Sequence, residues 1–305
     1  MPGRGAAIAL SVDALLGEPP AALHPTVWLG RWIDAGRRRR TARMPAGAFL
    51  EGALVVGGAT LLAAAAGLAV DRMISGLTPR STAGRAILRG LALKPALSLR
   101  ALLAAAGEVE SALRTGDLTD ARRLLSYHLV SRPTATLSAA DVAGATISSL
   151  AENMNDSVVA PLLAFRVGGL AAAYAYRAIN TADAMLGYRT PELEWFGKAA
   201  ARTDDVVSWI PARLSALLIA AAAPAVGGSP RAALAAARAD AGRCPSPNGG
   251  WPMAAAAGAL GVVLVKPGVY TLHASGRAPA AADVARARTL VAVAATVAAL
   301  AAESL

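Results

Sequence analysis

Long blocks of apolar residues, separated by short polar stretches, dominate this chain. Such blocks predict membrane-crossing helices, because a bilayer core of about 30 Å requires about 20 consecutive apolar residues. The candidate spans are 47–70, 157–179 and 206–226, with a last apolar helix at 284–302. Two further apolar runs, 6–16 and 253–265, are too short to span, and the second suits a half-helix or a re-entrant segment. The pattern predicts an all-α, multi-pass membrane protein with some short or broken membrane helices.

A different pattern fills the interval between the first two candidate spans. We interpret the mixed stretch 71–96 as a loop with a short interfacial helix. Apolar residues then recur with the helical period from Leu97 to Leu113 and again from Leu118 to Leu129. This pattern predicts a peripheral amphipathic helical hairpin. We therefore expect residues 71–150 to form a mainly extramembrane insertion within a single membrane-embedded domain, residues 1–305.

Ser138 and Asp141 have the spacing of a capping box, with Asp in place of Glu, and they predict the start of a helix. The expected apolar face of this helix carries Ala143, Ile147, Leu150 and Met154, and the broadly opposite face carries Ser148, Ser149, Glu152 and Asp156. Glu152 and Asp156 are four residues apart and therefore neighbours on a helix surface. Two like charges there are explained by a shared cation or cationic partner, or by a cap or an ion pair with an arginine.

Composition agrees with a membrane protein. The chain of 305 residues is 55% hydrophobic and only 16% charged, whereas soluble domains carry about 25% charged residues. The net charge of +10 is typical of cytoplasmic loops that contact the anionic headgroups of a lipid bilayer. We expect no nucleic-acid partner, because aromatic residues make up only 4% of the chain and no nucleic-acid module is recognisable. The single cysteine, Cys244, excludes an internal disulfide.

Most of the candidate chemistry lies between Glu152 and Arg213, where carboxylates, amides and cations flank two apolar runs. Ionisable groups are expensive at membrane depth, so such groups indicate a functional site. On a continuous helix, Asp205, Trp209 and Arg213 would stack at successive turns. A later turn containing Asn248 and Gly249 could direct backbone N–H groups at an anion, or could simply connect two helices. His24, which precedes a proline, is explained by either a structural or a binding role.

An ordered series of short motifs carries a resemblance that runs nearly end to end. The residues are Asp13, Gly17-Glu18-Pro19, His24-Pro25, Gly30-Arg31, Glu152-Asn153, Asp156 to Leu162, Gly168-Gly169, Tyr176 to Thr181, Asp183, Gly187-Tyr188-Arg189, Phe196-Gly197, Ala200-Ala201-Arg202, Asp204-Asp205-Val206, Ile210 to Leu214 and Ser246 to Gly250. With these residues the sequence resembles the cobalamin-biosynthesis CobD/CbiB family, adenosylcobinamide-phosphate synthase. The resemblance implies a membrane ligase that uses ATP and Mg²⁺ to join adenosylcobyric acid to an aminopropanol, usually as its phosphate ester.

Activating a carboxylate with ATP requires metal ligands, a base and groups that neutralise phosphate charge. We expect Glu152, Asp156, Asp183 and Asp205 to be catalytic, and Glu152, Asp156, Asp183 and Asp204 to hold the metal. Substrate and phosphate binding is assigned to His24, Asn153, Arg177, Asn180, Arg189, Lys198, Arg202, Arg213, Ser246, Asn248 and Gly249. Arginine suits this role because its planar fork matches phosphate geometry.

The chain departs from the family pattern at Pro133, Gly144, Ser148, Asn155, Cys244 and Val265-Lys266. These departures leave two further hypotheses open. One is a paralogue that forms a different amide, and the other is a corrinoid-binding transporter or scaffold without ligase activity. Contact with neighbouring cobalamin-pathway enzymes and a homo-oligomer are both compatible with the sequence.

The arginine cluster Arg37 to Arg40 and Arg43 precedes the first span and predicts that this span starts in the cytoplasm. Because ATP is cytosolic, the loops 27–46, 180–205 and 241–252 are expected on the cytoplasmic face of the cell membrane.

Overall fold

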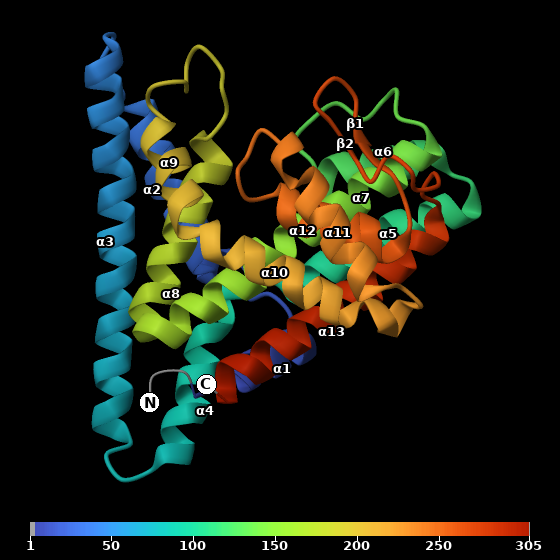
Figure 1. Cartoon of the computed structure of the whole chain (residues 1–305). Coiled ribbons are helices and arrows are strands. Elements are labelled where there is room, and N and C mark those ends of the chain that lie inside the picture. Colours follow the sequence, from blue (N-terminus) through green and yellow to red (C-terminus); the bar gives the residue numbers. More distant parts are fainter. Residues whose placement is uncertain (1–3, 305) are drawn as a thin grey trace. The chain divides into compact units, whose positions relative to one another are not determined.

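The computed structural model describes residues 4–304 and is almost entirely helical (Figure 1). It comprises two compact units. The first contains the described residues up to Ser98, Ala160–Ser208 and those from Ala299, and the second contains Leu99–Val159 and Trp209–Ala298. Within the described residues, four helical segments are long and apolar enough to cross a membrane: Pro45–Leu77, Ala139–Leu186, Trp209–Val226 and Ala281–Ser304. The expected all-α, multi-pass membrane fold is thereby confirmed.

The first unit contains α1 (Ala6–Leu16), η1 (Ala21–Leu23), α2 (Pro25–Arg38), α3 (Pro45–Leu77), α4 (Thr82–Leu93), η2 (Lys94–Ala96), α8 (Ala160–Leu186) and α9 (Lys198–Val207). The second contains α5 (Leu99–Thr115), α6 (Leu118–His128), α7 (Ala139–Met154), the π-helical turn η3 (Asn155–Val159), α10 (Trp209–Ala222), η4 (Ala223–Val226), α11 (Pro230–Asp240), η5 (Ala241–Arg243), α12 (Gly250–Leu260), β1 (Leu264–Lys266) and β2 (Tyr270–Leu272). The last helix, α13 (Ala281–Ser304), contributes to both units.

Helix α3 packs along α8 in the first unit (Figure 1). Its inner face is a stripe of small residues: Ala48, Gly52, Val56, Ala59, Ala63 and Gly67. A Cβ atom at Gly52 would lie 1.8 Å from the carbonyl oxygen of Phe196, so only glycine permits this close approach. The large side chains, among them Leu54 and Leu61, are exposed instead. Small residues inside and leucines outside are typical of a helix that packs tightly and faces lipid.

The first span is longer than the predicted 47–70, and the mixed stretch after it is largely helical rather than a loop. Asp71 continues α3 because its carboxylate is compensated: Arg89 of α4 donates to it at 2.7 Å, and the backbone N–H of Leu170 donates at 3.2 Å. In the sequence alone, the charged residues of the stretch 71–96 favour a loop. The structure pairs them across two helices, which makes them compatible with a continuous helix.

Helix α8 is broken at the glycine pair Gly168-Gly169. Gly169 has φ +65° and ψ −157°, a backbone conformation essentially restricted to glycine. Asp71 lies directly against this break, since a Cβ atom at Gly169 would be 2.7 Å from its Oδ2. The expectation that some membrane helices are broken is confirmed at this position.

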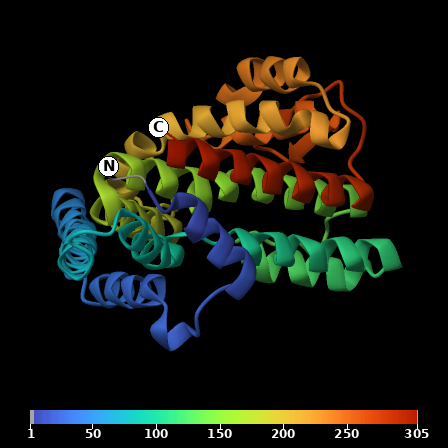
Figure 2. The same ribbon diagram turned by 90° about the horizontal axis from the view of Figure 1, so that it is seen from below.

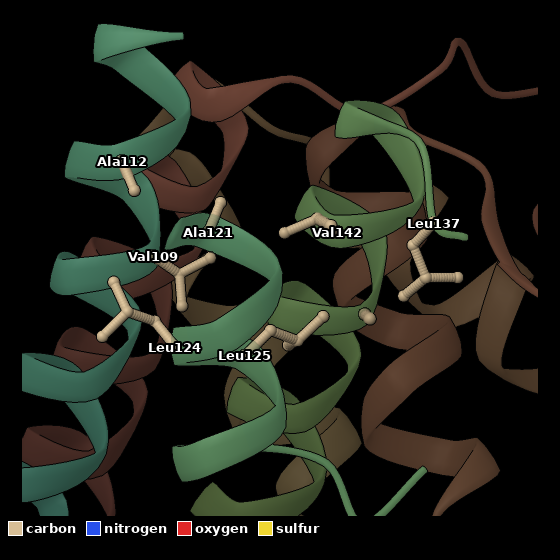
Figure 3. Packing of buried hydrophobic residues seen from close by; sticks show 8 residues of the cluster. Val109, Ala112, Ala121, Leu124, Leu125, Leu137 and Val142 are labelled. Carbon is tan, nitrogen blue, oxygen red and sulfur yellow. The ribbon is translucent and has the colours of Figure 1, made fainter. Parts of the chain in front are cut away.

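In the second unit, α5 and α6 form the predicted amphipathic hairpin and lie side by side (Figure 2). Val109 of α5, Leu125 of α6 and Val142 of α7 belong to one buried apolar cluster, shown in Figure 3. The capping box at the start of α7 is present: Ser138 Oγ accepts from the Asp141 backbone N–H at 3.2 Å, and Asp141 accepts from the Ser138 backbone N–H at 3.0 Å. The extramembrane position of residues 71–150 stays a prediction.

Helix α7 buries the polar side chains of Ser148 and Ser149 together with its apolar residues. The serine hydroxyls make this possible by donating to carbonyl oxygens, Ser148 to Gly144 and Ser149 to Leu129, both at 2.9 Å. Tyr270 lies in a small antiparallel hairpin, where it pairs with Lys266.

The span predicted at 206–226 begins later, because α9 ends at Val207 and α10 starts at Trp209. Asp205 therefore does not continue a helical stack with Trp209 and Arg213. Trp209 and Arg213 do stack, with the guanidinium carbon 4.1 Å from the ring centroid, while Asp205 is 3.5 Å from Arg202. The continuous apolar pattern gave no sign of this break.

A buried charge network joins the N-terminal elements of the first unit. The ammonium of Lys94 is 3.2 Å from Asp13, which is 0% exposed, and 2.9 Å from Glu18. His24 Nε2 lies 2.8 Å from the same Glu18 carboxylate. Burial alone would raise the pKa of Glu18, but the hydrogen bonds from Lys94 and His24 hold it below its usual value. This network connects α1, the start of α2 and η2.

We predict that Lys94→Met lowers the free energy of unfolding by about 3–5 kcal/mol, because it leaves Asp13 and Glu18 without their buried countercharge. Thermal unfolding of the detergent-solubilised protein measures the effect. Arg80→Met, at an exposed position outside any ion pair given by the described residues, is the control and should unfold like the wild type. Equal unfolding midpoints for the two variants would contradict the role of the network.

Candidate functional site

A small polar pocket of about 180 Å³ lies in the second unit. Three segments line it: the turn after α6, one face of α7, and the hairpin of β1 and β2. Its residues are Leu129, Val130, Ser131, Arg132, Ala145, Ser148, Ser149, Glu152, Asn153, Lys266 and Tyr270. Much of the surrounding unit is built from alanine and other apolar side chains, so this concentration of polar groups singles out the pocket.

Helix α7 places its polar groups by the helical period. Ser148 and Glu152 are one turn apart, as are Ser149 and Asn153, so the two pairs point to the same side. Ser149 also fixes its surroundings, because its hydroxyl donates to the Leu129 carbonyl and accepts from Asn153 Nδ2 at 3.0 Å. Asn153 donates in addition to the Ser149 carbonyl at 3.0 Å. The predicted binding residue Asn153 is therefore held in place beside Glu152.

The hairpin supplies a cation and a phenol from directly paired positions. Lys266 and Tyr270 are opposite each other in the register of β1 and β2, so their side chains leave the hairpin on the same face. The Tyr270 hydroxyl is close to Ser148 of α7 and donates to Met253 Sδ at 3.5 Å. Its side chain is largely buried and close to Glu152, which together raise the pKa of Tyr270 to about 12. The phenol therefore stays protonated at neutral pH and can act as a donor.

The turn after α6 supplies the second cation, Arg132. Thr134 anchors this turn by donating to the Arg122 carbonyl at 2.9 Å, and Arg122 donates back to the Leu137 carbonyl at 2.7 Å. Among the residues that the structure describes, neither Arg132 nor Lys266 makes an ion pair. Both are only half-buried. The pocket thus presents two cations and one carboxylate, Glu152.

The sequence pattern did not identify Arg132, Lys266 or Tyr270 as site residues. Lys266 stood out only as a departure from the family pattern, and so did Ser148, which lines the same pocket. The sequence feature that could have indicated Lys266 is its position as a single charged residue directly after the apolar run 253–265. Only the pairing of the two short strands shows that Lys266 and α7 face one pocket.

The loop containing Asn248 reaches the same carboxylate. A Cβ atom at Gly249 would lie 2.6 Å from Glu152 Oε1, so glycine at this position permits the approach. Ser246 holds the loop by accepting from the backbone N–H of Asn248 at 3.2 Å and of Gly249 at 3.4 Å. These two N–H groups, expected to face an anion, are thus engaged by the loop's own serine.

Arg213, predicted to bind phosphate, supports this loop. Its guanidinium donates to the Asn248 side chain at 3.0 Å and to the Trp209 carbonyl at 2.8 Å, and it stacks between the rings of Trp209 and Trp251. Such a clamp fixes the position of the Asn248 loop relative to α10. It also occupies donors that a phosphate would need.

Asp156 lies in the π-helical turn η3, a type of turn frequent at functional sites. Asn155 Nδ2 donates to the Asp156 carboxylate at 2.8 Å, and the buried Ser215 hydroxyl of α10 donates to Asn155 Oδ1 at 3.0 Å. The structure thus brings Glu152, Asn153, Asp156, Arg213, Ser246, Asn248 and Gly249 into one unit.

The other predicted site residues belong to the first unit: His24, Arg177, Asn180, Asp183, Arg189, Lys198, Arg202, Asp204 and Asp205. Arg177 donates to Asn180 at 3.2 Å, and Asp204 accepts from Ser208, whose hydroxyl is 3.1 Å from that of Tyr176. Burial raises the pKa of Asp205, an effect that Arg202 partly offsets. His24 has a structural role, because Nδ1 accepts from the Thr26 backbone N–H and so caps α2.

Arg177 and Tyr174 also line a larger apolar pocket of about 450 Å³ in the first unit. Trp28 and Trp32 of α2 and Leu62 of α3 contribute its walls. Its almost wholly apolar lining contrasts with the polar pocket of the second unit.

Within the described residues, no group of three or more His, Cys, Asp or Glu side chains could hold a metal. Mg²⁺, however, usually takes only one or two protein carboxylates together with substrate phosphates and water. Glu152 and Asp156 meet that smaller requirement by residue type.

A sequence profile described as CobD/Cbib protein matches residues 6–298. The probable cobalamin biosynthesis protein CobD of Methanothrix thermoacetophila is 40% identical over 311 residues, covering 96% of this chain and 93% of its own length. The cobalamin biosynthesis protein CobD of Geobacter metallireducens is 40% identical over 265 residues, covering 86% and 81%. That of Rhodobacter capsulatus is 38% identical over 303 residues, covering 92% and 89%. No solved structure matches the chain significantly.

Cys244 allows the environment beside Glu152 to be tested. Burial and the charge of Glu152 raise the pKa of the thiol to about 11. Because the thiolate is the reactive form, we predict alkylation at pH 8 roughly a hundredfold slower than for a small thiol of ordinary pKa, with a rate that rises about tenfold per pH unit up to about pH 10. As the chain has one cysteine, iodoacetamide uptake measured by mass reports on it alone. N-acetylcysteine is the control for a thiol of ordinary pKa. A plateau in the alkylation rate of Cys244 near pH 9 would show that its pKa is not raised and would contradict the environment described here.

Proposed function

Because this chain belongs to the CobD/Cbib family, we propose that it is a membrane-bound, ATP-dependent ligase of cobalamin biosynthesis. It joins a carboxyl group of adenosylcobyric acid to the amine of aminopropanol, in free or phosphorylated form, and produces adenosylcobinamide or its phosphate. The observation that carries this proposal is the polar pocket of the second unit, which Glu152 lines together with Arg132 and Lys266, two cations that make no ion pair among the described residues.

The reaction needs activation because a carboxylate is a poor electrophile. A carboxylate oxygen of the corrinoid attacks the γ-phosphorus of ATP, which gives an acyl phosphate and releases ADP. The neutral amine nitrogen then attacks the acyl carbon, the C–O bond to phosphate breaks, and phosphate leaves. The amine loses a proton in this step. Glu152 is our candidate to accept it, since its side chain lies in the pocket and its neighbours Ser149 and Asn153 are fixed by hydrogen bonds.

Glu152 and Asp156 are the carboxylates of the second unit that would hold Mg²⁺ together with nucleotide phosphates. Bound Mg²⁺ neutralises phosphate charge during transfer of the phosphoryl group. Asp183, Asp204 and Asp205 remain candidates for the same tasks from the first unit. Arg177, Asn180, Arg189, Lys198 and Arg202 remain candidates for phosphate and substrate binding.

The protein is proposed to lie in the cell membrane, with the polar ends of its helices in the cytoplasm. The N-terminal end of α3 follows the arginine cluster Arg37 to Arg40. Arg40 donates to the Glu192 carbonyl, so the loop between α8 and α9 is located at this same end of α3. Two of the three loops expected to share the cytoplasmic side therefore lie together within the first unit.

We predict that purified protein with adenosylcobyric acid, Mg-ATP and aminopropanol phosphate or aminopropanol yields the amide and ADP, detected by mass. Glu152→Gln should reduce turnover by about 10²–10⁴-fold, the range for loss of a general acid or base. Glu108→Gln changes an exposed carboxylate on α5 and should keep wild-type turnover.

Full activity of Glu152→Gln would contradict the role of this carboxylate. Corrinoid binding without any amide product would favour a transporter or scaffold instead. Product with another amine alone would identify a paralogue that forms a different amide.

The orientation of α3 is testable by labelling from outside the cell. In a Cys244→Ala background, Pro79→Cys, beyond the C-terminal end of α3, should react with an impermeant maleimide in intact cells. Arg43→Cys and Glu192→Cys should react only after permeabilisation, because they lie at the opposite, arginine-rich end. The reverse labelling pattern would contradict a cytoplasmic start of α3.

A further inference from the structure

We infer that the groove between α2 and α3 of the first unit binds an anionic phospholipid. An acyl chain of this lipid occupies the apolar pocket, and the headgroup phosphate lies at Arg39, near the loop that joins the two helices. The inference goes beyond the ligase proposal and does not depend on it, because binding of a lipid is measured without any substrate of the ligase.

The groove consists of two neighbouring cavities. The apolar pocket of about 450 Å³ is bounded by α2, α3, η2 and α8, and a second cavity of about 340 Å³ lies between α2 and α3 towards their connecting loop. Trp32 lines both cavities, so they follow one another along the same helix pair. The apolar pocket is hollow because α3 contributes small side chains to it, Ala59, Ala63 and Ala66 among them.

The polar groups in the wall of the apolar pocket are engaged by the protein itself. Trp28, Trp32 and Tyr174 donate to backbone carbonyl oxygens at 2.9, 3.1 and 2.6 Å. Thr26 and Arg177 are hydrogen-bonded to other side chains. The wall therefore presents rings and methyl groups to an occupant, and a hydrocarbon chain is the ligand that such a wall matches.

The groove opens to a surface with the character of a lipid-facing one. Trp28, Leu54 and Leu62 on its rim are each more than half exposed. Leu54 and Ala66, which line the two cavities, are separated by about 18 Å along α3. Half of a bilayer core measures about 15 Å, so the groove is long enough for an acyl chain of one leaflet.

The end of the groove near the connecting loop is positively charged. Arg39 and Arg40 line it, and Arg39 makes no ion pair among the described residues. The carboxylate in the same cavity, Glu51, accepts from the Thr41 backbone N–H at 3.2 Å and from the Thr41 hydroxyl at 2.7 Å. Glu51 is thus used to hold the loop, while Arg39 offers a lipid phosphate an opposing charge and a fork of donors.

The test is native mass spectrometry of the full-length protein in detergent. The protein is titrated with phosphatidylglycerol, with phosphatidylcholine of the same acyl chains, and with glycerol phosphate. We expect phosphatidylglycerol to bind about fivefold more tightly than phosphatidylcholine, the factor for one arginine near an anionic headgroup. Glycerol phosphate, which has the phosphate but no acyl chain, should not bind measurably.

Two substitutions separate the roles of the acyl chain and the headgroup. Ala66→Leu fills the apolar pocket from an exposed helical position and should weaken binding of both lipids by about tenfold. Ala65→Leu, at the adjacent exposed position outside the pocket, is its matched control and should bind like the wild type. Arg39→Gln should abolish the preference for phosphatidylglycerol, whereas Arg238→Gln, at an exposed position on α11, should keep it.

A lipid with brominated acyl chains locates the binding site, because bromine quenches the fluorescence of nearby tryptophans. Brominated phosphatidylglycerol should quench the wild type, and the double variant Trp28→Phe, Trp32→Phe should lose most of this quenching. Trp195→Phe changes an exposed tryptophan outside the groove and should keep it.

Thermal unfolding of each variant separates loss of binding from loss of folding. The inference is overturned if the two lipids bind equally, if folded Ala66→Leu keeps wild-type affinity, or if glycerol phosphate binds as tightly as phosphatidylglycerol. A preference that persists in Arg39→Gln, or quenching that persists without Trp28 and Trp32, would also overturn it. Amide formation by a protein that fails these tests would leave the ligase proposal standing.

Discussion

The structure depends on the compensation of every charge that lies inside an apolar, alanine-rich helical protein. Isolated buried charges are strongly unfavourable, so each must find a partner or the helix carrying it cannot pack. Asp13 is paired with Lys94, Asp71 with Arg89, and Glu110 with Arg288. Each of these pairs joins two segments distant in sequence, so the ion pairs also specify which helices are neighbours. Net stabilisation by such pairs is small, but removing one partner is costly.

The polar pocket of the second unit contains two cations, Arg132 and Lys266, that make no ion pair among the described residues. Arg132 and Lys266 are brought to the same place as Glu152 by a turn, a helix and a two-stranded hairpin. Every one of these segments has its own anchoring hydrogen bonds, such as those of Thr134 and Ser149. The segments that carry these charges are thus anchored, and preorganisation of this kind is what binding and catalysis require.

Two of the predicted binding residues also have structural tasks. Arg213 lies between two tryptophan rings and holds the Asn248 loop, and His24 caps α2 while bonding to Glu18. Substituting either residue therefore also disturbs the position of the loop or the helix. A loss of turnover in such variants therefore requires a folding control before it is assigned to chemistry.

The sequence alone determined the all-α membrane architecture with some broken membrane helices, the amphipathic hairpin and the capping box at Ser138, because these depend on local periodicity and backbone preferences. It also pointed to Glu152 through its spacing from Asp156. Only the tertiary structure decided that Asp71 continues α3, that Ser148 and Ser149 are buried, and that Arg132, Lys266 and Tyr270 share a pocket with Glu152. Those outcomes depend on contacts between residues far apart in the chain, which no local pattern encodes.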